Sequence, residues 1–357
     1  MALPGFVVSA GRKVKRGWEQ VRYRFIDRPK IHRHIQHLSG PLQLQATPTD
    51  AIVIGLMRDS EEHIPSFLEH HFRLGVRHIV LLDNGSVDRT VELASAHPQV
   101  TLLQTKMSYK DYKYAFRQYL IDRFCQKGWC LVLDIDERFD FPGSDQISLS
   151  QFLAYLNQHQ YTAVVSHMLD MFPEGDPDTW PKDGSEFARK SNWYNNTDLT
   201  QEPYVPYFNC TPSNEAIRYH WGGVRETIFG VHPNLTKHPL IYPAKGVSPV
   251  LYSSHFCANA RVADVSTVLL HYKFDRKFHE KCLRAVERGN YAGGSTEYKA
   301  YLQALESGEA RDLKRPGSRQ LEKIDQLVEE RFLEETNTYR QFVTQQARAQ
   351  SAASVSN

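Results

Sequence analysis

The sequence of 357 residues predicts an α/β protein built around a mostly parallel, doubly wound sheet that is flanked by helices. Short apolar runs alternate with segments whose apolar residues recur at helical spacing, and short loops join them. The first run, residues 51–56, has no polar side chain, as expected of a parallel strand with both faces buried. Polar clusters follow three of the runs, at Arg58-Asp59, Asp83-Asn84 and Asp134-Ile135-Asp136. Because ligands bind at the carboxyl ends of such strands, these clusters indicate one shared site.

Between residues 50 and 145, the predicted strands and helices alternate. Strands are expected at 51–56, 78–82, 100–103 and 130–133. The first helix is expected to begin with Ser60 as its N-cap and to end with Gly75 as its C-cap. Asp88 is expected to cap the second helix, and the third covers 112–124.

Beyond Pro142 the pattern becomes less regular. The predicted elements are a helix, two strands, a second helix and a long charged final helix, at 149–156, 162–167, 268–270, 276–288 and 318–349. The final helix is more typical of a packed or dimerising element than of a catalytic one. A polar region at 170–205 has the length of a binding loop or lid. Residues 289–294 are expected to form a flexible turn, and residues 351–357 to be disordered.

The composition is that of an ordinary soluble globular protein, with 41% hydrophobic and 24% charged residues. The five cysteines form no C-x-x-C pair, which argues against a disulfide framework or a zinc site and fits a reducing cytoplasm. The sequence has no apolar run of about 18 residues and no apolar core of a signal peptide near its start. The expected location is therefore cytoplasmic, with a peripheral position at the inner face of the membrane as an option.

Residues 1–49 form a basic N-terminal arm. Residues 1–50 carry nine lysines and arginines against three acidic residues, a balance of +6, which leaves −4 for the remainder because the chain total is +2. Such an arm can contact anionic lipid head groups or nucleic acid, or it can be a solvated and partly disordered leader. Trp18, Tyr23 and Phe25 favour a surface-docking role.

The acidic motif after the fourth strand has two interpretations. If 131–133 is a buried strand, Asp134 and Asp136 lie at i and i+2 and point to the same side. Two ionised carboxylates that close repel each other, so a compensating cation is needed, and Mg²⁺ or Mn²⁺ suits such hard oxygen ligands. The alternative is a solvated acidic corner, which is commoner for an isolated D-x-D.

Several segments resemble those of a known family. Leu81–Thr90 is similar to the "DNxSxDxT" segment of glycosyltransferase family 2-like enzymes, and Leu133–Glu137 is similar to their metal-binding "D-x-D-E". Further segments resemble a subgroup akin to the family 92 transferases, namely Gly222–Glu226, Leu269–Phe274 and Glu287-Arg288-Gly289-x-Tyr291. The resemblance covers residues 50–300 in consistent order, and it says little about residues 1–49 and the final helix.

The resemblance implies a GT-A fold. Enzymes with this fold transfer a sugar from a nucleoside diphosphate to an acceptor hydroxyl with the help of Mn²⁺ or Mg²⁺. Residues 50–145 would be the nucleotide-binding half and 146–300 the acceptor half, followed by a helical tail at 301–357. The partners would be a nucleotide-sugar donor and a glycan or lipid-linked acceptor.

By matching motifs, Asp136 and His271 would bind the metal, and Asp134 would contact the donor ribose or the metal and its waters. Taken alone, His271 would be interpreted as a satisfied surface histidine. Asp83 and Asn84 would face the nucleobase. Family members often have a second aspartate where Asn84 stands, but an amide oxygen still accepts a hydrogen bond from a base such as uracil. Glu137 would support the site from behind, and the donor-binding residues would also include Arg58.

The predicted catalytic residues lie in the Gly-Gly segment. Arg225 is the candidate to contact the diphosphate, against the alternative of a salt bridge to Glu226. Glu226 is the candidate general base of an inverting displacement. Three acidic residues of the lid-like region compete for that role, namely Asp170, Glu174 and Asp176. Four aromatic side chains are predicted either to stack on sugars or to anchor loops in the core, namely Trp180, Trp193, Tyr194 and Trp221.

The leading functional hypothesis is therefore a metal-dependent, inverting glycosyltransferase that uses a UDP-linked sugar. One alternative is a sugar-phosphate nucleotidyltransferase, although those enzymes have a Gly-rich loop that is not found after Leu56. Another is a non-catalytic nucleic-acid-binding module, against which the negative balance of the body speaks, so no nucleic acid is expected as a partner. A dinucleotide oxidoreductase or a P-loop enzyme is disfavoured because neither glycine motif is present.

Overall fold

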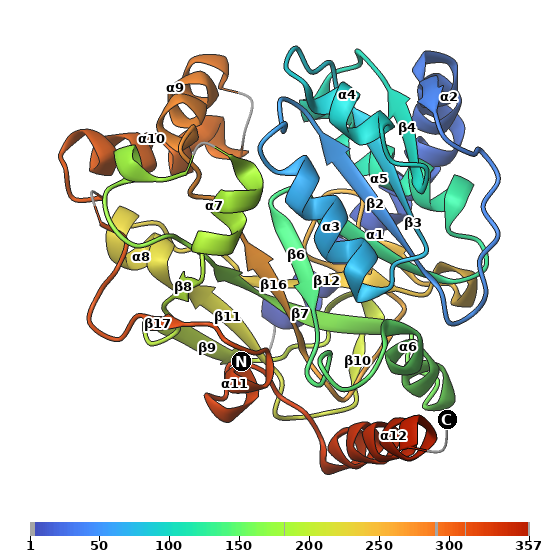
Figure 1. Ribbon diagram of the computed structural model, residues 1–357. Coiled ribbons are helices and arrows are strands. Elements are labelled where there is room, and N and C mark those ends of the chain that lie inside the picture. The colour runs from blue at the N-terminus through green and yellow to red at the C-terminus, as the bar shows by residue number, and fades with distance from the viewer. Residues whose placement is uncertain (1–3, 182, 290–291, 311, 356–357) are drawn as a thin grey trace.

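The computed structural model describes residues 4–181, 183–289, 292–310 and 312–355 (Figure 1). It is a mixed α/β protein with a large, mostly parallel central sheet flanked by helices. The strand order is β1 (Gln36–Ser39), β4 (Val100–Gln104), β3 (His78–Asp83), β2 (Ala51–Met57), β5 (Trp129–Asp134), β12 (Thr236–Ile241), β7 (Ala163–Asp170), β15 (Arg261–Val262) and β10 (Thr211–Pro212). Two further strands, β16 (Thr267–His271) and β6 (Glu137–Asp140), continue from β7. The predicted strands at 51–56, 78–82, 100–103, 130–133, 162–167 and 268–270 are all confirmed.

The parallel half of the sheet lies between two layers of helices. Strands β4, β3, β2 and β5 are parallel neighbours, and their side chains alternate between two apolar clusters. On one face, helices α3 (Ile64–Leu74), α4 (Thr90–Ser95), α6 (Leu149–Gln158) and α12 (Asn337–Val355) cover the sheet. On the other face lie α5 (Tyr109–Phe124), η1 (Tyr23–Asp27, a π-helical turn) and α2 (Arg28–His34). Helix α1 (Pro4–Arg22) leads into η1.

A third apolar cluster organises the second half of the chain. It contains residues of α7 (Gly184–Lys190), α8 (Val224–Phe229), α9 (Phe278–Arg288), α10 (Ala292–Glu306) and α11 (Asp325–Glu329). Figure 1 shows α7, α8, α9 and α10 gathered on one side of the molecule, away from α2, α4 and β4. Small sheets pair β11 (Arg218–Gly222) with β9 (Leu199–Pro203), β13 (Ser248–Pro249) with β14 (Cys257–Ala258), and β17 (Arg319–Gln320) with β8 (Trp193–Tyr194). Single 3₁₀ turns occur at Pro177–Thr179, Tyr207–Asn209 and Pro243–Lys245.

The first predicted helix begins later than expected, so the prediction of Ser60 as its N-cap is wrong. Helix α3 begins at Ile64, and His63 occupies the N-cap position. The carbonyl of Ser60 accepts the N–H groups of both residues and so closes a turn, while the Ser60 hydroxyl donates to the carbonyl of Arg58 at 3.0 Å. Pro65 stabilises the first turn of the helix. Gly75 is confirmed as the C-cap, with a left-handed φ of 102°.

The other predicted caps and the central helices are close to expectation. The Asp88 carboxylate accepts the N–H of Thr90 at 3.0 Å, although Arg89 holds the N-cap position of α4. Helix α5 begins three residues earlier than predicted because Ser108 caps it and accepts the N–H of Asp111. The region 170–205 is not a structureless loop, since it contains α7, β8 and β9.

The prediction of one final helix over 318–349 is wrong. Helix α11 ends at Glu329, and Arg331 takes a left-handed φ of 59°. The N–H groups of Phe332 and Leu333 both return to the carbonyl of Leu327, which ends the helix in a tight turn. The chain then starts again as α12, which packs on the sheet through buried Tyr339.

Two expected flexible segments are largely helical. Helix α12 continues to Val355, so the prediction of disorder is wrong for 351–355, while residues 356–357 lie outside the described part. Within the expected turn at 289–294, Gly289 is a left-handed C-cap with φ 55°, but 292–294 belong to α10. Residues 290–291 of that turn lie outside the described residues. No helix in the described part of the chain combines the length and apolarity needed to cross a membrane.

Candidate active site

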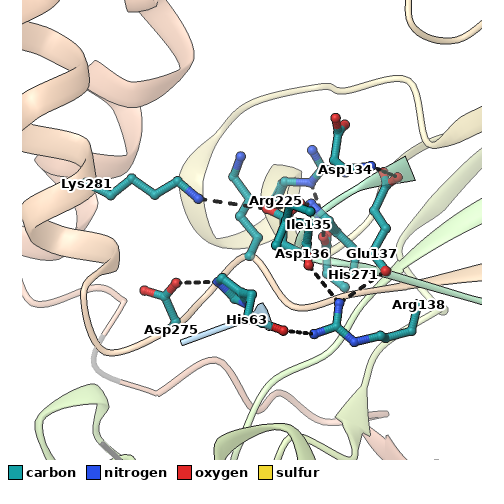
Figure 2. Close-up of polar contacts among 12 residues, drawn as sticks. His63, Asp134, Ile135, Asp136, Glu137, Arg138, Arg225, His271, Asp275 and Lys281 are labelled. Atoms are coloured by element: carbon teal, nitrogen blue, oxygen red, sulfur yellow. Dashed lines mark hydrogen bonds and ion pairs between the residues drawn. The ribbon is translucent and has the colours of Figure 1, made fainter. Parts of the chain in front are cut away.

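The acidic motif lies where β5 ends and β6 begins (Figure 2). Asp134 is the last residue of β5, Asp136 lies in the turn, and Glu137 opens β6. The period of a strand therefore stops before Asp136, and the two aspartates have separate cationic partners.

Asp134 lies between two cations. Its Oδ1 accepts a bond from Arg117 of α5 at 2.5 Å, and its Oδ2 accepts one from Lys237 of β12 at 3.0 Å. Lys237 also binds Glu137, whose other carboxylate oxygen accepts the backbone N–H of Asp134 at 3.0 Å. Burial opposes the ionisation of Asp134, but Lys237 and Arg117 together hold its pKa well below the usual value. This cluster of two cations and two carboxylates is neutral, and it needs no further cation.

Asp136 faces a different set of residues. Its Oδ2 lies 3.6 Å from Nε2 of His271 and 3.8 Å from Nζ of Lys281 in α9. The Nδ1 of His271 bonds to Oδ1 of Asp170 at 2.6 Å, and Oδ2 of Asp170 accepts a bond from Nε of Arg225 at 2.9 Å. A chain of alternating charge thus runs from partly buried Asp136 through His271 and Asp170 to Arg225, and the last three are buried.

The sheet register holds this chain in place. Strand β16 pairs with β6 on one side and β7 on the other, so His271 lies opposite both Glu137 and Asp170. The backbone N–H of Tyr272 donates to the carbonyl of Asp136 at 2.8 Å. Strand pairing therefore sets the relative positions of His271 and Asp170, and the bond from Tyr272 holds the turn that carries Asp136 against the same strand.

Burial and charge act in opposite directions on the ionisable groups of this chain. Burial opposes the charged form of Asp136, yet His271 and Lys281 hold its pKa well below the usual value. Burial would lower the pKa of His271, but Asp136 and Asp170 raise it. The pKa of Asp170 falls to about 2 because Arg225 and His271 outweigh its burial. Both carboxylates are therefore ionised at neutral pH.

The residues around Asp136 fit a divalent cation in part. A metal-binding histidine characteristically donates its other ring N–H to a carboxylate, as His271 does to Asp170, and this leaves Nε2 facing Asp136. A carboxylate and an imidazole suit Mn²⁺, which would take its remaining ligands from a diphosphate and water. The described residues contain no group of three or more His, Cys, Asp or Glu side chains arranged to hold a metal. The protein would therefore supply two ligands, whereas both oxygens of Asp134 are already held by cations.

A cleft opens beside Asp136, between the loop after β2 and helix α9. Its lining includes Arg58, His63, Asp275, Lys277 and Lys281. His63 bonds to Asp275 at 2.8 Å, which joins the two walls, and Lys281 reaches from the cleft toward Asp136 (Figure 2). The lining also includes Arg284 and three further carboxylates, namely Asp59, Glu61 and Glu62, so its four cations and four carboxylates balance. The cleft next to the two metal-ligand candidates is therefore densely charged.

The residues predicted to face the nucleobase lie at the end of β3. Asp83 is fully buried, and its carboxylate accepts the N–H groups of Gly85 and Ser86 at 3.0 and 3.2 Å. The amide group of Asn84 donates to the carbonyls of Thr105 and Met107. Asp83 therefore shapes the loop, while the amide oxygen of Asn84 receives no hydrogen bond from a described residue.

The structure separates the other predicted site residues. Arg58 is half exposed in the cleft and pairs with Asp59 at 3.6 Å. Arg225 is buried against Asp170, not paired with Glu226, which instead bonds to His232 at 2.7 Å. Among the competing acids, Asp170 belongs to the buried chain and Glu174 pairs with Lys314, while Asp176 lies in the loop before the 3₁₀ turn at Pro177–Thr179.

The four aromatic candidates divide into two pairs. Trp180 and Tyr194 are buried in the third apolar cluster, as the loop-anchoring interpretation expects. Trp193 packs under Lys314, whose Nζ lies 3.6 Å from the ring centroid, and Trp221 stacks on His232. Neither pair has a polar contact to Asp136 or His271 among the described residues.

Sequence reasoning missed the cations that complete the site, namely Arg117, Lys237 and Lys281. Lys237 meets Asp134 across 103 positions, and no local pattern marks such a contact. For Arg117 one signal was present: it is a single basic residue on the apolar side of α5, where a buried charge requires a partner.

No protein-family model matches this chain, and no curated protein matches it. Among solved structures, the chain is similar to a mannosyltransferase from Pyrobaculum calidifontis in complex with GDP-Man and Mn²⁺. The two chains are 14% identical, the match covers 97% of each, and the TM-score is 0.31. A likeness of this size carries no weight in the assignment of residues. The fold and the site together define an α/β protein with a charged cleft at the carboxyl edge of its sheet.

Proposed function

We propose that this protein is a metal-dependent, inverting glycosyltransferase of the GT-A type, which transfers a sugar from a nucleoside diphosphate to a hydroxyl of a glycan or lipid-linked acceptor. The observation that carries the proposal is the pair formed by Asp136 and Nε2 of His271, 3.6 Å apart at the edge of a charged cleft. The sequence likeness of 81–90 and 133–137 to family 2-like enzymes supports the same conclusion.

Asp136 and His271 would hold the cation, Mn²⁺ or Mg²⁺. When bound, that cation would neutralise charge on the diphosphate leaving group. Asp170 orients His271 through Nδ1 and keeps Nε2 free, and Arg225 keeps Asp170 ionised. In this proposal Arg225 positions the site instead of contacting the diphosphate, because its side chain is only 5% exposed.

The donor would lie in the cleft. Lys281 and Arg58 would contact its phosphates by charge-assisted hydrogen bonds, and the free amide oxygen of Asn84 would accept from the base. Asp83 would hold the loop that carries Asn84. Asp134, which lies between Arg117 and Lys237, would face the donor ribose. UDP is the proposed nucleotide.

Glu226 remains the proposed general base. Its carboxylate is 44% exposed and bonds to His232, so it is accessible to an acceptor hydroxyl. In an inverting displacement, it would take the proton of that hydroxyl while the acceptor oxygen attacks the anomeric carbon and the diphosphate leaves from the opposite face.

The test is nucleotide binding by calorimetry, with UDP and GDP, each with and without Mn²⁺. We expect binding that requires the metal, and we expect Asp136→Asn to weaken it at least about 100-fold, since one of two protein ligands loses its charge. Glu174→Gln, an exposed carboxylate paired with Lys314, is the matched control. Unchanged metal-dependent binding in Asp136→Asn would show that the site is assigned wrongly.

Product analysis then separates the reaction classes. With a panel of nucleotide sugars and Mn²⁺, a glycosyltransferase slowly releases a nucleoside diphosphate by hydrolysis. Release of pyrophosphate would instead identify a nucleotidyltransferase and contradict the proposal.

A further inference from the structure

The N-terminal segment is fixed to the body through one face only. Tyr23 of the π-helical turn donates to Asp122 of α5 at 2.6 Å, and His32 of α2 bonds to Tyr119 at 2.8 Å. Lys30 donates to the hydroxyl of Tyr112 on the same helix at 2.7 Å. These contacts attach η1 and α2 along α5, near β4 in Figure 1.

The opposite face carries an exposed apolar stripe. Its members follow one another at intervals of four, three and four residues, which places them on one side of a helix. Their exposed fractions are high for such side chains, at 74% for Val14, 67% for Trp18, 51% for Val21 and 69% for Phe25. Basic residues flank the stripe in sequence, among them Lys13, Arg22 and Arg24, all of them exposed or half-exposed.

A basic groove lies beside the stripe. It is formed jointly by the N-terminal segment and α5, and three arginines line it, namely Arg24, Arg28 and Arg123. None of their guanidinium groups forms an ion pair with a described residue. The single acid in the groove, Asp122, is already occupied by Tyr23 and by Gln118, which donates at 2.7 Å. With three arginines against one carboxylate, the groove presents net positive charge to solvent.

We infer that this face is a docking surface for a bilayer that contains anionic phospholipids. The helix would lie in the plane of the interface with the stripe in the acyl boundary, and the three arginines would contact lipid phosphates. Trp18 suits that depth because its ring is amphipathic. The surface includes Arg123 of the body, so it is broader than the basic arm alone.

Two other occupants are disfavoured by the same features. Nucleic acid would use the arginines but would leave four large apolar side chains in water. A second copy of the chain would cover the stripe, but a two-fold interface would bring the same arginines together and they would repel. Of the three occupants, a bilayer with anionic phospholipids is the one that would contact both the apolar stripe and the arginines.

The test is co-flotation of the full-length protein with vesicles. We expect binding to vesicles of phosphatidylcholine and phosphatidylglycerol, much weaker binding to phosphatidylcholine alone, and loss of binding as ionic strength rises from about 0.1 to about 0.5 M. The double variant Trp18→Ser/Phe25→Ser and the triple variant Arg24→Gln/Arg28→Gln/Arg123→Gln should each reduce partitioning at least about 10-fold.

Matched controls keep the test specific. Val205→Ser removes an exposed apolar side chain elsewhere, and Arg73→Gln/Arg77→Gln/Lys323→Gln removes three exposed charges elsewhere. Both should float like the unchanged protein. Each variant must keep the parent circular dichroism and melting temperature; if the double variant does not, Trp18→Ser alone with brominated lipids as quenchers gives the same comparison.

Several outcomes would overturn the inference. These are no flotation with anionic vesicles, equal flotation with neutral ones, or unchanged flotation of either test variant. If the unchanged protein is a dimer without lipid and Trp18→Ser/Phe25→Ser is a monomer, a second copy of the chain is the occupant. If the protein binds RNA more tightly than vesicles, nucleic acid is the occupant. Because flotation requires no enzymatic activity, its result is independent of the proposed function.

Discussion

Replacement of Asp170 by asparagine tests whether the buried chain behind Asp136 stabilises the protein through charge. Asp170 is 5% exposed and touches two cationic partners, at 2.6 Å to His271 and 2.9 Å to Arg225. Its pKa lies at about 2 instead of 3.8. A difference of nearly two pKa units corresponds to about 2 kcal/mol of unfolding free energy at neutral pH. Removal of one member of a buried pair characteristically costs about 3–5 kcal/mol because the other charge is left uncompensated. We therefore expect Asp170→Asn to lower the unfolding free energy by about 2–5 kcal/mol.

The pH dependence of the stability difference shows whether the effect of the substitution comes from charge. A depressed carboxyl pKa contributes stability that is fully present above the unfolded pKa and is lost as the pH falls toward the folded one. The difference between the unchanged protein and Asp170→Asn should therefore be constant between about pH 5 and pH 6 and should shrink from about pH 4 downward. It should also fall above about pH 6.5, because Asp170 helps to raise the pKa of His271 and that contribution is lost as the imidazole loses its proton. A purely steric effect of the substitution would not follow the pH.

Urea unfolding measures the effect, followed by both far-ultraviolet circular dichroism and tryptophan fluorescence so that two-state behaviour is checked in a chain of this size. Glu174→Gln is the control, since that carboxylate forms an exposed ion pair with Lys314 and should cost less than about 1 kcal/mol. The reasoning fails if Asp170→Asn costs no more than the control, or if its cost is the same at about pH 3 and about pH 6.

Three further results are expected. Mn²⁺ affinity, measured by calorimetry, should fall by up to about 10-fold per pH unit as the pH drops below the raised pKa of His271, because the proton and the metal compete for Nε2; a flat profile would exclude this histidine as a ligand. Gly143→Ala should lower the melting temperature, at a cost of about 1–3 kcal/mol, because a Cβ there would lie 2.8 Å from Val343 of α12 at a φ of 77°, whereas Gly246→Ala, at a φ of 82° in open space, isolates the backbone contribution and should cost less. Thiol titration should find no fast-reacting cysteine in the folded protein and five after unfolding, since all five are free and buried.

The parallel half of the fold could be predicted because its strands are buried on both faces. Residues 51–56 and 130–133 have to be apolar at every position, and this leaves an unbroken run in the sequence. Strand β12 leaves no such run. It carries Lys237 toward Asp134, and Pro239 lies within its irregular pairing with β7, so the sequence Thr-Lys-His-Pro-Leu-Ile shows neither strand periodicity nor continuous apolarity.

The residues of the candidate site also divide into those that could be predicted from the sequence and those that could not. Asp134, Asp136 and His271 could be singled out because the first two follow a recognisable strand and the family likeness marks all three. Arg117, Lys237 and Lys281 could not be assigned, because each meets its carboxylate through a contact between distant elements. Arg225 is predicted from the sequence to contact the diphosphate, whereas the proposed function makes it a support for His271, because it is buried against Asp170.

The divergence of the two aspartates follows from where β5 ends. Up to Asp134 the chain keeps its strand pairing with β2, so the side chain of Asp134 remains over α5 and is neutralised there by Arg117 and Lys237. The turn then brings the chain into β6, whose antiparallel register with β16 places Glu137 opposite His271 and so sets Asp136 beside the imidazole. The ladder of β16 fixes His271, and the backbone bond from Tyr272 holds the carbonyl of Asp136, so the sheet sets the distance of 3.6 Å between the two side chains. In the proposed function, a metal would therefore meet a pair of ligands that the sheet holds in place, and mutations of the cleft wall should change nucleotide affinity more than metal affinity.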